Sequence, residues 1–371
     1  MRPCVAFLRN ASKCIYNVNK ASQITTRKGD LNVKVLVGMS GGLDSTYAAQ
    51  LLLGEGAEVV GAVLRMHGYT ECDAARESCR FLGIPCVEID CRSEFDAAVR
   101  RNFIDEYSRG RTPNPCIVCN ERVKFKCLYD YAVKNGFDKI ATGHYARIVK
   151  INNRHAVAFA KDLRKDQSYM LYRLPEEILA RLMLPLSDLT KEEIRERALN
   201  MGISAAEREE SQDICFLPDG NYAEYIENEV GRFPEGDFVD KDGKVIGRHK
   251  GIVRYTVGQR KGLGISLGKR VFVTDINASS NSITLSDSIG GKSEAVIEDV
   301  VYSGVESYSE LAGLSLFARP RYSSPLLTIS AEPLGDGTVK VRFDREIKVA
   351  PGQSLVAYAN GIIVFGGVIK G

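Results

Sequence analysis

The chain has 371 residues, of which 44% are hydrophobic and 26% are charged, and its formal net charge is +3. A chain of this length is too long for one ordinary core, so we predict two or three domains. A nearly neutral charge neither requires nor excludes a nucleic-acid partner, because only a local basic patch decides such binding. No apolar run approaches the roughly 20 residues that span a bilayer, so we expect no membrane partner.

The ten cysteines all lie in the first 215 residues. A disulfide framework would extend over a whole secreted chain, so this distribution favours reduced cysteines in a cytoplasmic protein. The first 29 residues contain six basic residues and no acidic one, a composition that is also typical of transit peptides. We expect residues 1–30 to form a disordered basic extension outside the fold.

From residue 33 on, short apolar runs alternate with segments of helical periodicity. The apolar runs predict strands over 33–39, 57–66, 85–90 and 138–146. The periodic segments predict helices over 44–56, 73–84, 95–110 and 125–137. Strands that alternate with helices imply a parallel sheet covered on both faces, so we predict an α/β domain over residues 31–215.

The pattern changes after Cys215. A helix is predicted over 220–230, and two-fold patterns with turns at 241–244 and 278–282 predict a small mixed central domain over 216–287. The last part, 288–371, contains five predicted strands, which suggest a small antiparallel β-barrel. An Asp-Gly turn separates the second from the third of these strands, which are 315–322, 326–334, 338–347, 354–360 and 362–369.

The stretch VLVGMSGGLDST, residues 35–46, runs from a predicted strand through two glycines into a predicted helix. A helix N-terminus carries free N–H groups and a partial positive charge, so this turn predicts a phosphate site. Gly41 and Gly42 let the backbone approach phosphate oxygens, and Ser40 and Ser45 add hydroxyl donors. Asp44 either caps the helix or helps to hold a Mg²⁺ ion between phosphates.

This loop lacks the Lys-Ser/Thr pair of a Walker motif and the third glycine of a dinucleotide fingerprint. Its Ser-Gly-Gly-x-Asp-Ser pattern closely resembles the pyrophosphate loop (PP-loop) of ATP pyrophosphatases, which belong to the adenine nucleotide alpha hydrolase-like fold. That resemblance implies ATP as cofactor, with Mg²⁺, and an adenylation reaction that releases pyrophosphate. The residues implied to bind ATP are Gly38, Met39, Ser40, Gly41, Gly42, Leu43, Asp44 and Ser45.

A Cys-x-x-Cys pair, Cys116 and Cys119, lies beside two prolines in RTPNPCIVCNERVKF, and Cys215 follows much later in SQDICF. Such pairs lower thiol pKa values and favour redox or metal chemistry. A structural zinc site usually needs four ligands, and no second pair is obvious. Three cysteines would suit an iron–sulfur cluster with one open iron, or a nucleophile pair with a bystander.

From about residue 33 the whole chain resembles the tRNA-uridine 2-sulfurtransferases, the tRNA-specific 2-thiouridylases of the MnmA/TrmU family. Six separated motifs occur in the order of that family: GMSGGLDS, GRTPNPCIVCN, ATGHYAR, KDQSY, SQDICF and YTVGQRKGLGI. The resemblance implies a transferase that thiolates the wobble uridine, position 34, of certain tRNAs. ATP would adenylate the C2 oxygen, and a persulfide would deliver sulfur to C2.

The resemblance also implies roles for single residues. Cys215 would carry the persulfide, and Cys119 would be its disulfide-forming partner. Leu64 and Gly143 would contact the nucleotide. The central domain would contact tRNA, and the partner of the whole protein would be the anticodon region of tRNA. A sulfur-relay protein or a cysteine desulfurase would supply sulfur. The residues that match tRNA contacts are Asn114, Pro115, Cys116, His144, Lys165, Asp166, Gln167, Arg321, Tyr322 and Gln353.

The chain departs from the family pattern at Cys116, where many members have an aspartate that is the proposed general acid or base. Cys116, Cys119 and Cys215 could instead ligate a [4Fe-4S] cluster, as in related cysteine-rich RNA thiolases. The segment after the second strand is also short and lacks tryptophan. Loop-dependent tRNA contacts are therefore not transferred to this chain.

Two other functions fit parts of the sequence. An ATP pyrophosphatase that thiolates or amidates a small molecule would share the phosphate loop, but it leaves the barrel and the TPNPCIVC motif unexplained. An RNA-binding module with a decayed nucleotide domain conflicts with the intact Ser40, Asp44, Cys119 and Cys215. Arg260 and Lys261 are candidates for RNA contact. Cys72 and Cys79 share a helix face, so we expect that they could pair under oxidation.

Overall fold

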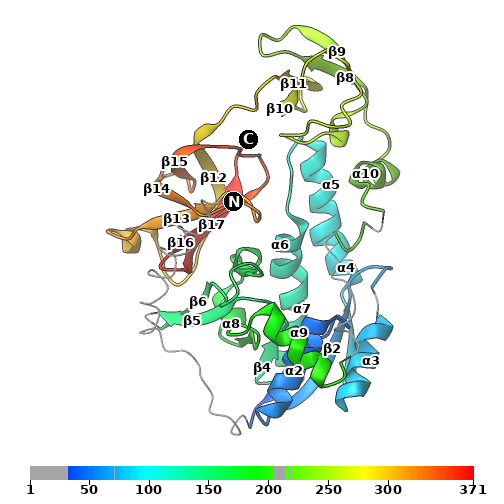
Figure 1. Ribbon diagram of the computed structural model, residues 1–371, viewed down its shortest axis with the longest axis vertical. Coiled ribbons are helices and arrows are strands. Elements are labelled where there is room, and N and C mark those ends of the chain that lie inside the picture. Colours follow the sequence, from blue (N-terminus) through cyan, green and yellow to red (C-terminus); the bar gives the residue numbers. More distant parts are fainter. Residues whose placement is uncertain (1–31, 71, 152, 204–213, 218) are drawn as a thin grey trace.

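The computed structural model describes residues 32–70, 72–151, 153–203, 214–217 and 219–371. The basic extension expected over 1–30 lies outside the described residues. Figure 1 shows three bodies: a helix-rich body at the bottom, a small sheet at the top and a barrel at the left. No helix within the described ranges combines the length and the apolar character that a membrane crossing requires.

The N-terminal sheet is parallel throughout, with the strand order β3-β2-β1-β4-β7. Its central strands β1 and β2 are buried over nearly their whole length, as continuous apolar runs in a covered parallel sheet are. The α/β class is therefore confirmed. The strands are β1 (Lys34–Gly38), β2 (Glu58–Arg65), β3 (Cys86–Asp90), β4 (Lys139–Ala141) and β7 (Leu182–Met183).

Two helical segments of this body contain a π turn. One consists of α4 (Arg92–Phe95), η2 (Asp96–Arg100) and α5 (Arg101–Ser108), and the other of α6 (Pro115–Cys119), η3 (Asn120–Lys124) and α7 (Phe125–Lys134). Proline is suited to the first turn of α6, where its missing N–H costs no hydrogen bond. The other helical elements are α2 (Leu43–Gly54), α3 (Cys72–Leu82), η4 (Ser168–Leu171), α8 (Glu176–Leu179) and α9 (Lys191–Asn200).

The central sheet has the strand order β10-β11-β8-β9, in which β11 and β8 are parallel and the other pairs antiparallel. The predicted turns at 241–244 and 278–282 join β8 to β9 and β10 to β11. A mixed central body is thus confirmed. Its elements are α10 (Tyr222–Val230), β8 (Gly236–Val239), β9 (Val245–His249), η6 (Ile252–Arg254), β10 (Phe272–Asn277) and β11 (Ser282–Ser286).

The C-terminal barrel is antiparallel, as predicted, but the expectation of five strands is wrong. A further strand, β12 (Lys292–Tyr302), pairs with both β15 and β17 and closes the ring. Its sequence KSEAVIEDVVY mixes charged and apolar residues, so the apolar pattern alone does not reveal it. The other elements are η7 (Tyr308–Leu311), β13 (Leu316–Arg319), β14 (Leu327–Pro333), β15 (Val339–Ile347), β16 (Ser354–Ala359) and β17 (Ile362–Ile369).

The described parts of the three bodies are joined by a strand pairing and by a shared apolar core, among other contacts. A hairpin of β5 (Arg147–Ile151) and β6 (Arg154–Ala158) leaves the N-terminal body and pairs with β17 of the barrel. One continuous apolar core extends from the N-terminal sheet through Phe216 to the central sheet, whereas most of the barrel residues form a core of their own. The end of α6 is therefore held between parts of the chain that are far apart in sequence.

Candidate active site

The loop between β1 and α2 has the geometry of a phosphate site. Ser40 and Ser45 face each other, with 3.1 Å between their hydroxyl oxygens. The Ser45 hydroxyl also donates to the Gly42 carbonyl at 3.1 Å, so the loop is closed by its own side chains. Ser40 is exposed and Ser45 is buried, which leaves one hydroxyl open to a ligand at the N-terminus of α2.

The glycines in and beside this loop differ in whether packing requires them. Gly41 has a left-handed φ of +76°, and a Cβ added there would lie 2.6 Å from Ala74 at the start of α3. Gly143 is equally constrained, because its Cβ would lie 2.6 Å from the backbone of Asp44. Gly42 has an ordinary φ of −86°, and the nearest atom to its Cβ would be Ser40 Oγ at 3.4 Å. Packing thus requires Gly41 and Gly143, whereas a Cβ at Gly42 would meet only Ser40 Oγ.

Asp44 does not cap α2, which corrects one of its two expected roles. The N-cap residue is Gly42, which has no side chain to accept a hydrogen bond. Asp44 lies in the first turn, and its Oδ1 accepts hydrogen bonds from Lys191 Nζ and from the Tyr145 hydroxyl, both at 2.7 Å. Lys191 is buried at the start of α9. It lies 147 residues from Asp44 in sequence, so no local motif could have revealed the pair.

The segment in front of α6 is the junction of the three bodies. A Cβ at Gly110 would lie 2.7 Å from Ile276 of the central sheet. Arg111 pairs with Glu298 of β12 at 2.8 Å, and the Thr112 N–H donates to Pro351 at 2.8 Å. The motif GRTPNPC thus fixes α6 against both other bodies.

Three thiols from two distant parts of the chain share one region at the end of α6. Cys116 and Cys119 lie one turn apart on α6, and Cys215 lies in the segment 214–217. Cys119 is buried, with its Sγ 3.6 Å from Sδ of Met66, whereas Cys116 and Cys215 are exposed. The Cys119 thiol interacts electrostatically with both other thiols. The structure therefore brings the predicted catalytic cysteines together.

Cys215 is held in place by the residue that follows it. The ring of Phe216 packs edge-on against Phe95 of α4 and Phe103 of α5, with 5.5 Å and 5.3 Å between ring centroids. Aromatic pairs of this kind contribute about 0.5–1.5 kcal/mol each beyond the burial of area. The backbone next to the Cys215 thiol is thus anchored in the continuous core.

The expectation that the Cys-x-x-Cys pair lowers thiol pKa values is wrong for this structure. Burial is the main cause that raises the pKa of the Cys119 thiol to about 11. The pKa values of Cys116 and Cys215 are also raised, because surrounding protein atoms partly desolvate these thiols although both residues reach the surface. The positive charge of Lys124 opposes this rise at all three thiols. Lys124 ends η3, across a π turn from Cys119, and π turns are frequent at functional sites. Motif comparison alone does not single out this lysine.

Comparison with known proteins shows the relationship of the whole chain. Residues 33–219 match the family model of the tRNA methyl transferase HUP domain, residues 223–287 that of the tRNA methyl transferase PRC-barrel domain, and residues 296–369 that of the aminomethyltransferase beta-barrel domain. The tRNA-specific 2-thiouridylase MnmA 1 of Clostridium tetani is 40% identical over 354 residues, which cover 91% of this chain and 96% of that protein. The chain belongs to the tRNA-specific 2-thiouridylase family.

Further relatives agree with this thiouridylase assignment. The MnmA protein of Clostridium acetobutylicum is 38% identical over 361 residues, which cover 92% of this chain and all of that protein. Among solved structures, a 4-thiouridine synthetase in complex with RNA and ATP is 19% identical, covers 53% of this chain and 50% of its own, and has a TM-score of 0.37. The membership predicted from the six motifs is confirmed by the sequence relatives.

The residues that match thiouridylase contacts to tRNA differ in exposure. Arg321 and Tyr322 are exposed, and Lys165 is half-buried. Gln167 Oε1 accepts the Tyr145 N–H at 2.9 Å, and Gln353 Nε2 donates to the Thr112 carbonyl at 2.7 Å, so both amides have partners within the protein.

Three further residues of this set are Asn114 and Pro115, which directly precede Cys116, and His144, which follows β4. Pro115 is buried at the start of α6, and Asn114 donates to Met170 Sδ at 3.8 Å. His144 Nδ1 lies 2.9 Å from the Thr142 hydroxyl. Burial, and then the charge of Lys124, holds the pKa of His144 well below its usual range, so its ring is neutral at physiological pH.

Asp166 is buried in the loop that carries the KDQSY motif. Its Oδ1 accepts the Ala160 N–H at 3.0 Å, and its Oδ2 accepts the Ser168 hydroxyl at 2.7 Å, while Arg319 lies 3.7 Å away. Burial raises the pKa of Asp166 to about 6. In this structure the buried Asp166 carboxylate orders the loop that carries the half-buried Lys165 and Gln167.

The raised pKa of Asp166 predicts a specific pH dependence of stability. The folded protein holds this proton more firmly than the unfolded chain, so the stability contributed at low pH is lost as pH rises from about 4 to about 6 and stays constant above. Urea unfolding of the wild type and of Asp166→Asn measures this contribution. The free energy of unfolding of the wild type minus that of Asp166→Asn should fall over that interval. A value that stays constant or rises with pH would contradict the assignment.

The described residues include no group of three or more His, Cys, Asp or Glu side chains placed to hold one metal ion. The three thiols therefore do not form a ready ligand set for an iron–sulfur cluster, and no step is derived through one. Asp44 Oδ1 is held by Lys191 Nζ and the Tyr145 hydroxyl.

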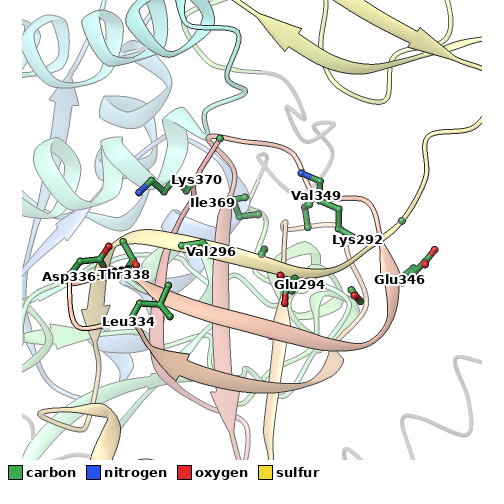
Figure 2. A pocket seen from close by; sticks show the side chains of 14 residues that line it. Lys292, Glu294, Val296, Leu334, Asp336, Thr338, Glu346, Val349, Ile369 and Lys370 are labelled. Atoms are coloured by element: carbon green, nitrogen blue, oxygen red, sulfur yellow. Dashed lines mark hydrogen bonds between the residues drawn. The ribbon is translucent and has the colours of Figure 1, made fainter. Parts of the chain in front are cut away.

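Two cavities differ in their relation to this site. One of about 480 Å³ lies at the carboxyl ends of β2 and β3, lined by Arg65, Glu88 and Ala74, and Leu64 directly precedes it on β2. Ligands of open α/β sheets bind at these strand ends, and Ala74 also touches the phosphate loop. The other, of about 640 Å³, lies at one end of the barrel, where Figure 2 shows acidic and basic side chains mixed. None of its lining residues belongs to the phosphate loop.

Proposed function

We propose that this protein uses ATP to convert a uridine of tRNA, at the wobble position 34, into 2-thiouridine. Membership of the thiouridylase family supports this reaction. The observation that carries it is the meeting of Cys119 and Cys215 at the end of α6, in the same body as the phosphate loop. An ATP pyrophosphatase that amidates a small molecule would need the loop but not this pair of thiols.

The reaction divides into activation and sulfur transfer. The uridine C2 oxygen attacks the α-phosphate of ATP and pyrophosphate leaves, with its charge held at the N-terminus of α2. The terminal sulfur of a persulfide on Cys215 then attacks C2, and AMP leaves with the former C2 oxygen. Cys119 attacks the Cys215 sulfur, which releases 2-thiouridine and leaves a Cys119–Cys215 disulfide for an external thiol to reduce.

The arrangement of the thiols suits these roles. Cys215 is exposed, so a sulfur-relay protein or a cysteine desulfurase can load it. Cys119 is buried and its pKa is about 11, so its thiol is protonated at neutral pH. Lys124 favours the thiolate when that proton leaves, because its charge opposes the effect of burial. Cys116 also has a raised pKa, which suits a proton donor better than a base.

Contact with tRNA requires basic groups beyond the site itself. We assign phosphate contacts to the exposed Lys and Arg side chains of the loop between η6 and β10. Three of them, Arg260, Lys269 and Arg270, line a cavity of about 640 Å³. Glycines with left-handed φ values hold this loop in shape at positions 258, 262, 264 and 268. The basic residues concerned are Arg260, Lys261, Lys269 and Arg270.

Removal of two of these charges should weaken the binding of all tRNAs alike, because phosphate contacts do not depend on the nucleotide sequence. For Arg260→Ala/Lys261→Ala we expect the slope of log K against log salt to become less steep by about 2. Each lost phosphate contact removes about 0.9 from the magnitude of this slope. Binding titrations over a range of salt concentrations measure this slope. The control Lys134→Ala/Arg197→Ala removes two exposed charges elsewhere, and an equal effect there would refute the assignment.

The direct test is thiolation in vitro. The protein is incubated with unmodified tRNA, ATP, Mg²⁺ and a persulfide donor, and the tRNA is digested for mass spectrometry of its nucleosides. We expect 2-thiouridine, formed only when ATP is present. Adenylation of a small molecule by ATP, with release of AMP and no change in tRNA, would favour a small-molecule enzyme. Binding of tRNA with no AMP formation at all would favour a decayed RNA-binding module.

A further inference from the structure

Two cysteines outside the active site are brought together by a glycine of β2. Cys79 lies on α3 and is 1% exposed. A Cβ added at Gly61 would lie 2.4 Å from the Cys79 sulfur and 3.0 Å from Cγ of Met39. The Cys79 thiol therefore occupies the space that a side chain at position 61 would fill.

Cys86 enters the same space from the neighbouring strand. It begins β3, and it is the register partner of Gly61 in the parallel pair of β2 and β3. Register partners on adjacent strands direct their side chains to the same face of a sheet. Cys86 thus points to the face that α3 covers, toward the Cys79 sulfur. Burial raises the pKa of Cys79 to about 12, and the nearby Cys86 thiol adds to the rise.

This geometry corrects the expected pairing of Cys79 with Cys72. Both lie on α3, where seven residues correspond to a rise of about 10.5 Å. A disulfide requires Cα atoms about 4.4–6.8 Å apart, so the helix holds these two cysteines beyond reach of each other. The partner that the fold supplies to Cys79 lies across the helix–sheet interface.

We propose that Cys79 and Cys86 form an oxidation site that closes to a disulfide under hydroperoxides. Cys86 is exposed, so its sulfur attacks the peroxide, becomes a sulfenic acid and releases an alcohol or water. The Cys79 sulfur then attacks the sulfenic sulfur. Hydroxide leaves, takes up the Cys79 proton and departs as water, so that the two thiols lose two electrons to one peroxide.

The position of this pair gives the disulfide a structural consequence. It would join α3 to β3, and the first turn of α3 touches the phosphate loop at Gly41. Met39, in the same loop, borders the thiol pair from the other side. Oxidation would therefore fasten a helix that bounds the phosphate site. This disulfide would form whether or not the protein thiolates tRNA.

Tryptic peptides separate the two cysteines and make the test direct. Cys79 lies in the peptide 77–80, and Cys86 lies in the peptide 81–92 together with Cys91. The folded full-length protein is treated with hydrogen peroxide, alkylated and digested without reduction. We expect a cross-link between these two peptides that disappears on reduction.

Variants assign the cross-link to one pair. It should be lost in Cys86→Ser and should persist in Cys72→Ser, which removes a cysteine from the same helix, and in Cys91→Ala. A cross-link that survives in Cys86→Ser, or the absence of any cross-link to peptide 77–80 in the wild type, would overturn the proposal. Circular dichroism of Cys86→Ser confirms that the variant is folded, because this side chain is exposed.

Discussion

Replacement of Cys119 or Cys215 by serine should abolish 2-thiouridine formation. We expect a loss of at least about 10³-fold, equivalent to about 4 kcal/mol of transition-state stabilisation, because sulfur delivery and release each need a thiol. Adenylation uses the phosphate loop and not the thiols. Both variants should therefore still exchange labelled pyrophosphate into ATP in the presence of tRNA.

Cys116→Ala is the matched control, since Cys116 lies on α6 one turn from Cys119 and is also a cysteine. We expect it to lose about 10²-fold in thiolation and to stay measurably active, since a general acid contributes about 10²–10⁴-fold and water replaces this one in part. A Cys116→Ala variant as inactive as Cys119→Ser would favour a site in which all three cysteines act together. It would count against the persulfide route.

Gly41→Ala should damage both the fold and the reaction. The left-handed backbone at Gly41 and the 2.6 Å approach of Ala74 both oppose a side chain there. We expect a loss of at least about 3 kcal/mol in the free energy of unfolding, from backbone strain and steric overlap together. AMP formation should fall with it, because α3 or the loop must move. Thermal melting and an AMP assay measure the two effects.

Gly42→Ala separates packing from ligand contact at the neighbouring position. The φ of Gly42 lies in the ordinary negative range, and an added Cβ would meet only Ser40 Oγ. We therefore expect the free energy of unfolding to change by less than about 1 kcal/mol. ATP affinity should nevertheless fall, because the new methyl group occupies the side from which phosphate approaches. If Gly41→Ala melted like the wild type, or if Gly42→Ala unfolded as readily as Gly41→Ala, the account of this loop would be wrong.

The sequence predicts the architecture well where local pattern determines it. The alternation of strands and helices, the glycine-rich loop and the two hairpin turns of the central body all depend on residues that are close in sequence. The barrel strand β12 is missed because its charged residues hide the two-fold pattern. Its partners β15 and β17 become known only when the barrel closes.

The site is less predictable, because tertiary contacts create much of it. Motifs identify Cys119 and Cys215, but not the Lys124 charge that acts on both. Asp44 is visible in the loop motif, whereas its partner Lys191 comes from a distant helix. The pKa direction of the Cys-x-x-Cys pair is predicted wrongly, because burial outweighs the effect that the motif has in exposed redox sites.

The central claim is that ATP activates the uridine C2 oxygen before sulfur arrives from a thiol. It is tested most directly with tRNA that carries ¹⁸O at C2 of the target uridine. We predict that the AMP released during thiolation contains the label in its phosphate, one atom for each 2-thiouridine formed. Unlabelled AMP alongside 2-thiouridine would show that ATP activates another group, and would contradict the account.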